Sequence, residues 1–180
     1  MRIISGQWRG RVIVAPKGET TRPTAERTRE ALFSMLLSRL GSFQGLRVAD
    51  LFAGSGALGL EALSRGAVMC TFVEQDRQAI EALRTNVSAL KAEADIRAQS
   101  ATTLAPSSEP YDLVMIDPPY GTGAGQVVLD RCKRLGWVGP STLISIETGR
   151  AETVTVPGFL VEAERVHGKA KITLLRPSAQ

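Results

Sequence analysis

The sequence predicts an α/β fold with a mostly parallel, twisted β-sheet. From residue 46 onward, strand-like apolar runs alternate with helical patterns, which is typical of the βαβ units that build a parallel sheet. A glycine-rich turn follows the first of these runs, as it does in folds that bind a ligand at the end of a strand. The runs 159–167 and 169–176, joined at Gly168, predict an antiparallel hairpin that adds one reversed strand.

The expected elements follow one another in a simple order. Residues 1–20 are expected to form a small β element, with strand candidates at 2–4 and 11–15. Pro23 followed by Thr24, a natural N-cap, predicts a helix that runs to about residue 40. Its apolar stripe consists of Leu32, Phe33, Leu36, Leu37 and Leu40. Further strands are expected near 46–52, 68–74, 94–98, 112–117 and 142–147, and helices near 57–65, 76–91 and 124–135.

Length and composition limit the protein to a small set of classes. At 180 residues we expect one domain with an appendage: a basic N-terminal β-hairpin arm at 1–20 and a catalytic domain at 21–180. No apolar run is long enough to span a bilayer and no apolar signal region begins the chain, so a cytoplasmic location without membrane attachment is expected. Cys70 and Cys132 are far apart and lack metal-ligand spacing, so no metal site is expected.

Positive charge is concentrated at the start of the chain. The whole chain has a net charge of only +4, yet residues 1–29 hold seven basic and two acidic side chains. This asymmetry indicates a polyanionic partner, a solvated charged face being the alternative. Trp8, beside Arg9 and near Arg11, is a candidate for stacking on a base, although it would equally serve to anchor the hairpin. Arg27 and Arg29 lie in the first turns of the expected helix, against the preference of its dipole, and together with Arg22, which precedes the helix, they are further candidates for contact with this partner.

The stretch around the glycine-rich turn indicates a nucleotide-like cofactor. Gly54, Gly56 and Gly59 have G-x-G-x-x-G spacing, which permits a tight turn and the close approach of a ligand, while an ordinary strand-to-helix turn is the alternative. Asp50 lies inside the preceding apolar strand, where a carboxylate is costly unless a cationic or amine-bearing group pairs with it. Glu74 ends the next strand, where an acid can accept hydrogen bonds from a ribose diol. The candidates for the border of an adenine ring, after the third strand, are Ser100 and Ala101.

The tetrad Asp117-Pro118-Pro119-Tyr120 follows another apolar strand and has the features of a site for an amino group. Two successive prolines stiffen the loop and remove two N–H donors, so the carbonyl oxygen of Pro118 has a fixed direction. With the carboxylate of Asp117 it makes a pair of acceptors for one planar NH2 group, and Tyr120 adds a flat surface for an aromatic ring. A rigid turn without a ligand is the alternative.

Two groups of motifs resemble a known family. Residues 50–67, DLFAGSGALGLEALSRGA, together with the tetrad at 117–120, resemble Rossmann-like S-adenosylmethionine-dependent methyltransferases. The segments at 2–11, RIISGQWRGR, and at 22–30, RPTAERTRE, narrow the resemblance to bacterial 16S ribosomal RNA guanine-N2 methyltransferases of the RsmD type. The resemblance implies a seven-stranded sheet with S-adenosylmethionine as the methyl donor. It also implies that the acceptor is a guanine in 16S rRNA, within a partly or fully assembled small ribosomal subunit.

The resemblance assigns roles to particular residues, and the reaction it implies is a direct displacement without a covalent enzyme intermediate. The donor would be held by Asp50, Phe52, Gly54, Ser55, Gly56 and Glu74, with Ser100 and Ala101 beside the adenine. The target base would be held by the catalytic tetrad Asp117, Pro118, Pro119 and Tyr120. Many relatives that methylate amino groups have Asn at the position of Asp117, so an acid there is compatible with guanine N2 without proving it.

Three other functions fit parts of the sequence. The amino group could be adenine N6 or a protein glutamine amide, because both present an NH2 group. A nicotinamide-dependent oxidoreductase would share the glycine spacing and Glu74 but would leave the tetrad unexplained. A non-catalytic RNA-binding module would use the basic arm but would leave the cofactor site without a task.

Overall fold

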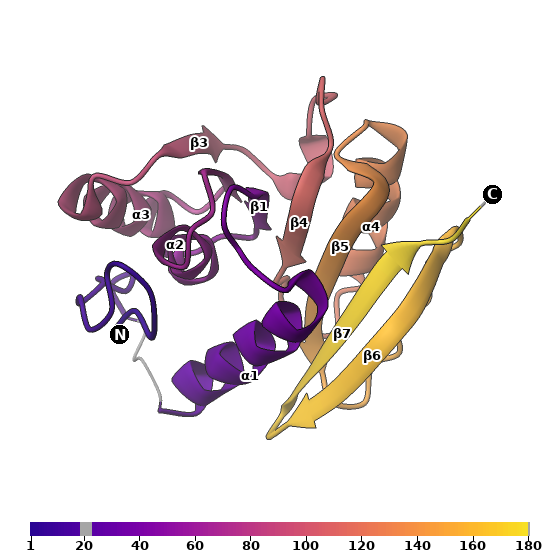
Figure 1. Cartoon of the computed structure of the whole chain (residues 1–180), viewed down its shortest axis with the longest axis horizontal. Helices are drawn as coiled ribbons and strands as arrows, with labels where there is room; N and C mark the ends of the chain where they lie inside the picture. The colour runs from indigo at the N-terminus through magenta and orange to yellow at the C-terminus, as the bar shows by residue number, and fades with distance from the viewer. Residues whose placement is uncertain (19–22, 180) are drawn as a thin grey trace.

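One β-sheet of seven strands forms the centre of the computed structural model, which describes residues 1–18 and 23–179 (Figure 1). In sequence order the strands are β1 (Arg47–Leu51), β2 (Met69–Glu74), β3 (Ala94–Ala98), β4 (Tyr111–Ile116), β5 (Val138–Gly149), β6 (Phe159–His167) and β7 (Ala170–Pro177). Their order across the sheet is β3-β2-β1-β4-β5-β7-β6. The predicted α/β class and the seven strands are thereby confirmed.

Neighbouring strands from β3 to β5 are all parallel, and β7 is the one reversed strand. It runs antiparallel to both β5 and β6, which confirms the predicted C-terminal hairpin. The chain moves outward from β1 to β2 and β3, and then returns to β4 on the other side of β1. The strand order therefore reverses between β1 and β4, and open α/β sheets bind ligands outside the carboxyl ends of the strands at such a point.

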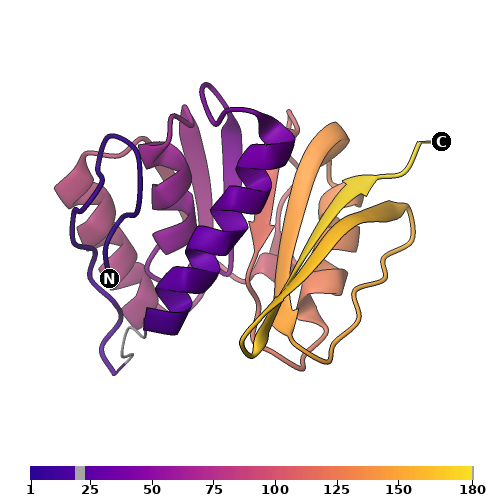
Figure 2. The same cartoon turned by 60° about the horizontal axis from the view of Figure 1, so that its bottom comes forward.

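Helices cover both faces of the sheet (Figure 2). The helices over the first face are α1 (Pro23–Leu40), α2 (Ala57–Ser64) and α3 (Arg77–Leu90). The second face is covered by α4 (Ala124–Arg134) and the short 3-10 turn η1 (Ala101–Thr103). Each face has its own apolar core, because successive strand residues point to opposite sides: Val48 lies in the first core and Ala49 in the second.

Local chemistry explains several boundaries of these elements. β1 ends where Phe52 takes a positive φ of 62°, one residue short of the predicted strand end. α3 begins after Asp76, whose carboxylate accepts a hydrogen bond from the N–H of Ala79 at 2.9 Å as an N-cap. β5 starts earlier than predicted because Val138 pairs with Tyr111 at the start of β4.

The N-terminal arm, residues 1–18 of the described chain, contains less β structure than predicted. Its only strand-like pairing in that range is an isolated antiparallel bridge between Arg2 and Val12. The reason is that the arm bonds to the body of the protein: Ser64 of α2 accepts hydrogen bonds from Gln7 N at its carbonyl oxygen and from Trp8 N at its hydroxyl. The arm lies beside α2 and α3 in both overall views, and its buried isoleucines join the first core.

The described residues limit what can be said about two predicted residues, the membrane and a metal. Arg22 lies outside the described residues, as does the side chain of Thr24. Within residues 1–18 and 23–179, no helix is long and apolar enough to cross a membrane. In the same ranges, no group of three or more His, Cys, Asp or Glu side chains is arranged to hold a metal ion.

Candidate active site

A cavity of about 610 Å³ lies at the carboxyl ends of β1, β4 and β5, where the strand order reverses. From β1 and the turn after it, the lining residues include Asp50, Phe52, Gly54 and Ser55. From the ends of β4 and β5 come Asp117, Tyr120 and Glu147. The structure thus brings four of the residues predicted to hold a donor next to two of the residues predicted to hold an acceptor.

The opposite wall of this cavity comes from segments far away in the sequence. Arg29 of α1 lines it, together with Met1 and Ala15 of the arm. The end of β6 and the turn that follows it add His167 and Lys169. The site is therefore acidic on the side of the sheet, whereas the side of α1 and the hairpin carries basic side chains together with one acid, Glu26.

The glycine-rich turn between β1 and α2 has the tight geometry that the sequence predicts. Gly54 and Gly56 have positive φ values of 57° and 88°. A Cβ on Gly59 would lie only 2.3 Å from Cε1 of Phe72, so a glycine is required for α2 to approach β2 this closely. A Cβ on Gly56 would lie 2.5 Å from Cδ1 of Leu83, so Gly56 packs against the core and does not line the cavity.

Asp50 is a buried carboxyl group whose hydrogen bonding is incomplete. Only 1% of the residue is exposed, and its Oδ2 accepts a hydrogen bond from the N–H of Gly59 at 2.9 Å. Its Oδ1 is buried without a hydrogen-bond partner among the described residues. Burial raises the pKa of Asp50 to about 8, opposed by the Gly59 hydrogen bond and reinforced by the charge of Glu74. A cationic or N–H-bearing ligand in the cavity would favour the ionised form.

Glu74 braces the glycine-rich turn from the end of β2. Its Oε1 accepts a hydrogen bond from the N–H of Gly54 at 3.0 Å. Its Oε2 accepts from the N–H groups of Gln75 and Asp76, at 2.8 and 3.1 Å. Glu74 does not line the cavity, so its predicted contact with a ribose stays a prediction.

The two predicted neighbours of an adenine ring lie further along the sheet edge, after β3. The hydroxyl of Ser100 accepts a hydrogen bond from Thr102 N at 3.2 Å and caps η1. Ala101 is buried in the core of the second face. Neither residue lines the 610 Å³ cavity, and their role as an adenine border stays a prediction.

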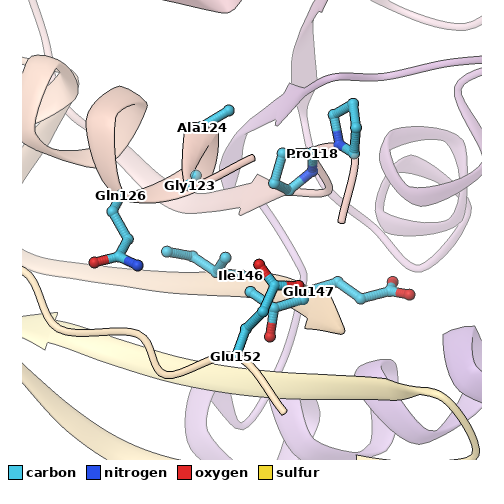
Figure 3. A pocket seen from close by; sticks show the side chains of 10 residues that line it. Pro118, Gly123, Ala124, Gln126, Ile146, Glu147 and Glu152 are labelled. Atoms are coloured by element: carbon cyan, nitrogen blue, oxygen red, sulfur yellow. The ribbon is translucent and has the colours of Figure 1, made fainter. Parts of the chain in front are cut away.

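Two acidic side chains from the end of β5 and the turn after it, Glu147 and Glu152, lie across a small pocket from Pro118 of the Asp117–Tyr120 tetrad (Figure 3). The Tyr120 hydroxyl donates a hydrogen bond to Oε1 of Glu147 at 2.5 Å. Glu152 accepts at Oε1 from Gly121 N at 3.0 Å and at Oε2 from Gly149 N at 2.5 Å, so it fixes the loop that follows the tetrad. Tyr120 as a whole residue nevertheless remains 48% exposed, which leaves area for a stacked base. Two other members of the tetrad line a small pocket of about 10 Å³ next to the main cavity: Pro118 and Pro119.

Carboxyl groups from three neighbouring strands meet in the cavity. Burial raises the pKa of Asp117 well above its usual range, and the charges of Glu147 and Asp50 add to this shift. Burial also raises the pKa of Glu147, against the effect of its hydrogen bond from Tyr120. Because these carboxyl groups resist ionising together, the site favours a ligand that brings positive charge or several N–H donors. Glu147 was not predicted as a site residue, although it gave the same signal as Glu74 and Asp117, an acid near the end of an apolar strand.

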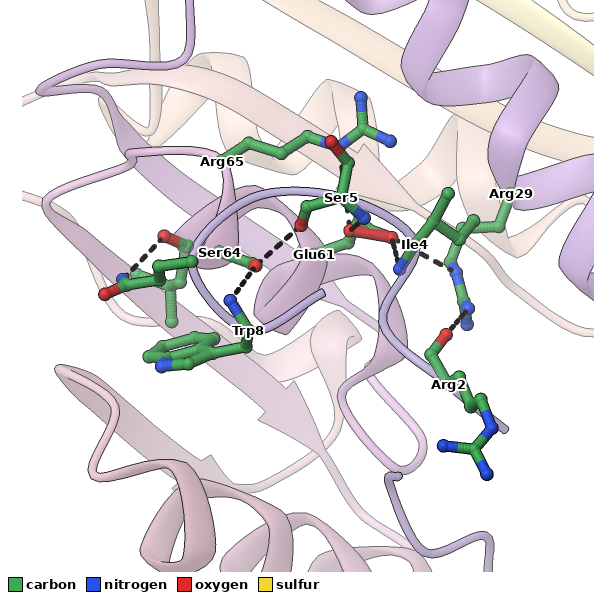
Figure 4. Close-up of polar contacts among 10 residues, drawn as sticks. Arg2, Ile4, Ser5, Trp8, Arg29, Glu61, Ser64 and Arg65 are labelled. Atoms are coloured by element: carbon green, nitrogen blue, oxygen red, sulfur yellow. Dashed lines mark hydrogen bonds and ion pairs between the residues drawn. The ribbon is translucent and has the colours of Figure 1, made fainter. Parts of the chain in front are cut away.

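The arm is held on the body by buried polar groups of α2 (Figure 4). Glu61 is 0% exposed and accepts hydrogen bonds from the N–H groups of Ile4 and Ser5, at 2.8 and 3.3 Å. It also forms ion pairs with Nε of Arg29 at 3.9 Å and Nε of Arg65 at 3.6 Å. Glu61 therefore joins the arm, α1 and α2 through one side chain.

The predicted RNA-contacting residues fall into two groups. Arg9 and Arg27 are exposed, and the guanidinium of Arg11 donates to the carbonyl oxygen of Ala89 at 3.1 Å on the surface. Trp8 is half-buried and packs against the first core, whereas Arg29 is buried and donates a hydrogen bond to the carbonyl oxygen of Arg2. Burial lowers the pKa of Arg29, opposed mainly by Glu61. A role in RNA binding stays a prediction for all of them.

The sheet order, the glycine-rich turn after β1 and the cavity at the switch point are those of a Rossmann-like, S-adenosylmethionine-dependent methyltransferase. A solved structure described as "Putative methyltransferase yhhF from Escherichia coli" superposes with a TM-score of 0.88 and 38% sequence identity, covering 100% of this chain and 99% of that one. The oxidoreductase and the non-catalytic RNA-binding module are not supported by these findings.

The particular family follows from the sequence relatives. The model of the family "Conserved hypothetical protein 95" matches residues 1–176. "Ribosomal RNA small subunit methyltransferase D" of Escherichia coli (strain K12) is 37% identical over 184 residues, with 100% of this chain and 91% of the relative covered. The protein of the same name from Haemophilus influenzae is 35% identical over 163 residues, with 87% and 83% covered. The chain belongs to this family, the RsmD-type methyltransferases that its motifs resemble.

Proposed function

We propose that this protein transfers a methyl group from S-adenosylmethionine to the exocyclic N2 amine of a guanine in the 16S rRNA of the small ribosomal subunit. The observation that carries the proposal is the single cavity shared by the glycine-rich turn and the Asp117–Tyr120 tetrad. The names of the relatives, which specify RNA of the small ribosomal subunit, support the class of acceptor. The cytoplasm is the compartment in which bacterial ribosomal RNA is present.

The donor side of the cavity fits a cationic, adenosine-bearing molecule. Asp50 offers a buried oxygen that lacks a partner among the described residues, and Gly54 leaves open space where any other residue would place a Cβ. We assign the donor to these residues with Phe52 and Ser55, while Glu74 holds the turn in shape. When bound, S-adenosylmethionine supplies an electrophilic methyl group on a positively charged sulfur.

The acceptor side fits one amino group on an aromatic ring. The carboxyl of Asp117 and the carbonyl of Pro118 accept the two N–H bonds of the amine, which orients the nitrogen lone pair for attack. The exposed ring of Tyr120, fixed by its hydrogen bond to Glu147, stacks on the base after the base leaves its own stack in the RNA. After methyl transfer, the surplus proton on the amine moves to Asp117 or to water.

The basic arm provides the contact with the RNA backbone. Arg9 is exposed, and Arg11 lies on the same arm with one guanidinium nitrogen bonded to Ala89. Both can neutralise phosphates, whose contacts position the RNA without reading its sequence. The substrate is 16S rRNA in a partly or fully assembled small subunit, and no metal takes part.

The test is methyl transfer from labelled S-adenosylmethionine to 16S rRNA, presented naked and in small-subunit particles, followed by nucleoside analysis. Labelled N2-methylguanosine is expected, and the faster substrate identifies the assembly state that the enzyme uses. Labelled N6-methyladenosine would overturn the guanine assignment and retain the donor. No label in RNA, with label in a protein glutamine, would overturn the RNA assignment altogether.

A further inference from the structure

Asn86, on the buried side of α3, forms hydrogen bonds with two segments that are distant in sequence. Only 2% of the residue is exposed. Its Oδ1 accepts from the N–H of Val14 at 2.7 Å, and its Nδ2 donates to the carbonyl oxygen of Val14 at 2.9 Å. The same Nδ2 donates to the carbonyl oxygen of Ser55 at 2.9 Å. The side-chain amide thus holds both segments at once.

These two segments belong to the two halves of the proposed site. Val14 lies in the arm, next to Ala15, which lines the cavity. Ser55 lies in the glycine-rich turn and lines the cavity as well. A single buried amide therefore connects the arm assigned to RNA with the turn assigned to the donor, across the wall of the cavity that both of them border.

Ser64 provides a contrast within the same arm. It is also buried, its hydroxyl accepts from Trp8 N at 3.0 Å, and it donates to the carbonyl oxygen of Ser5 at 2.6 Å. Its hydrogen bonds reach the arm and stop there. Asn86 and Ser64 thus both anchor the arm, and of these two only Asn86 also bonds to the glycine-rich turn.

We propose that Asn86 is a positioning residue that couples RNA binding at the arm to donor binding at the glycine-rich turn, an inference that rests on the proposed function. RNA bound at the arm restricts the motion of Val14, and the three hydrogen bonds of Asn86 pass this restriction on to the carbonyl of Ser55. The entropy lost in fixing this network is then lost once for both ligands, so each ligand strengthens the binding of the other. Linkage requires the same factor in both directions.

The experiment measures the Kd of the protein for 16S rRNA at physiological salt, with and without saturating S-adenosylhomocysteine. In the wild type we expect the demethylated donor to tighten RNA binding about five- to tenfold, and RNA to tighten donor binding by the same factor. Asn86→Ala is expected to bring this ratio to about one while each ligand still binds alone. Ser64→Ala, the matched control, is expected to weaken RNA binding and to keep the ratio.

The outcomes separate this inference from the proposed function. A ratio of one in the wild type, or an unchanged ratio in Asn86→Ala, would overturn the coupling. A folded wild type that binds neither RNA nor S-adenosylhomocysteine would overturn the proposed function instead. If Asn86→Ala fails to fold, hydrogen exchange of the wild type decides: RNA is expected to slow exchange of the Gly56 N–H, which bonds to Ala53 O at 2.8 Å, and no slowing would contradict the coupling.

Discussion

Two buried carboxyl groups in this protein have opposite surroundings. Glu61, at 0% exposure, is surrounded by donors: two backbone N–H groups of the arm and the guanidinium groups of Arg29 and Arg65. Asp50, at 1% exposure, has the single N–H of Gly59 and one oxygen without a partner in the described part of the chain. Equal burial therefore accompanies complete pairing in one place and incomplete pairing in the other.

This difference separates a structural residue from a binding residue. Removing one partner from a buried, fully paired charge is strongly destabilising, because the remaining charges are left uncompensated. A buried carboxyl with an unpaired oxygen is costly for the empty protein, and a ligand can recover that cost. Glu61, which holds the arm, is a structural residue, and Asp50, in the cavity, is a binding residue. Substitutions of Glu61 should therefore change stability, whereas substitutions of Asp50 should change ligand binding.

The largest effect is expected from Asp117→Ala. The change removes one of the two proposed acceptors for the amine, so the rate of methyl transfer should fall at least about a thousandfold. Binding of S-adenosylhomocysteine, measured by calorimetry, should change by no more than about threefold, because Asp50 and the glycine-rich turn remain. Asp130→Ala on the surface of α4 is the control, and near-normal turnover by Asp117→Ala would refute the acceptor model.

The contrast between the two buried carboxyl groups is tested by comparing the stability of two variants, Glu61→Gln and Asp50→Asn. Glu61→Gln leaves the buried guanidinium of Arg29 and the partly buried one of Arg65 without their carboxylate, so urea denaturation at pH 7 should show a loss of about 3 kcal/mol in the free energy of unfolding. Asp50→Asn removes a carboxyl that burial disfavours, so the ligand-free variant should be at least as stable as the wild type. Equal losses in both variants would mean that the contrast between the two sites has no energetic meaning.

The pH dependence of stability sharpens the same contrast. The folded protein holds a proton on Asp50 up to pH about 8, whereas the unfolded chain releases it near its ordinary pKa. Between the two pKa values, the native state binds more protons than the unfolded chain does. Asp50 therefore makes the free energy of unfolding fall as the pH rises. Asp50→Asn should therefore gain about 2 kcal/mol relative to the wild type between pH 6 and pH 8, at about 1.4 kcal/mol per pH unit for a fully retained proton. Parallel pH curves for the two proteins would contradict the raised pKa.

The smallest effect is expected in the arm. Arg9→Ala combined with Arg11→Ala removes two charges available to phosphates, so RNA affinity should fall about tenfold and its dependence on salt should weaken. The matched control is Lys133→Ala combined with Arg134→Ala on α4, across the sheet, which changes the net charge equally. Equal RNA affinity of the arm variant and the wild type at low salt would show that the arm does not bind RNA.

The sequence was sufficient for the parts of this protein that local patterns determine. Strand and helix alternation predicted the sheet and its reversed strand, and the glycine spacing predicted the turn after β1. The position of Glu147 beside Tyr120 depends on which strands become neighbours, so a strand-end acid was the only local sign of it. The burial of Arg29 was not predicted, because its partner Glu61, on α2, is remote in sequence and comes near only in the folded protein.

The last strand of the described chain, β7, lies inside the sheet between β5 and β6. During synthesis β6 therefore emerges before the strand that is its partner, and it has no place in the sheet until β7 follows. The hairpin must dock as one piece, and its turn delivers Lys169 and Ala170 to the wall of the cavity. On the ribosome, the binding site thus cannot be completed before β7 has emerged, so ligand binding by a nascent chain would report the docking of this hairpin.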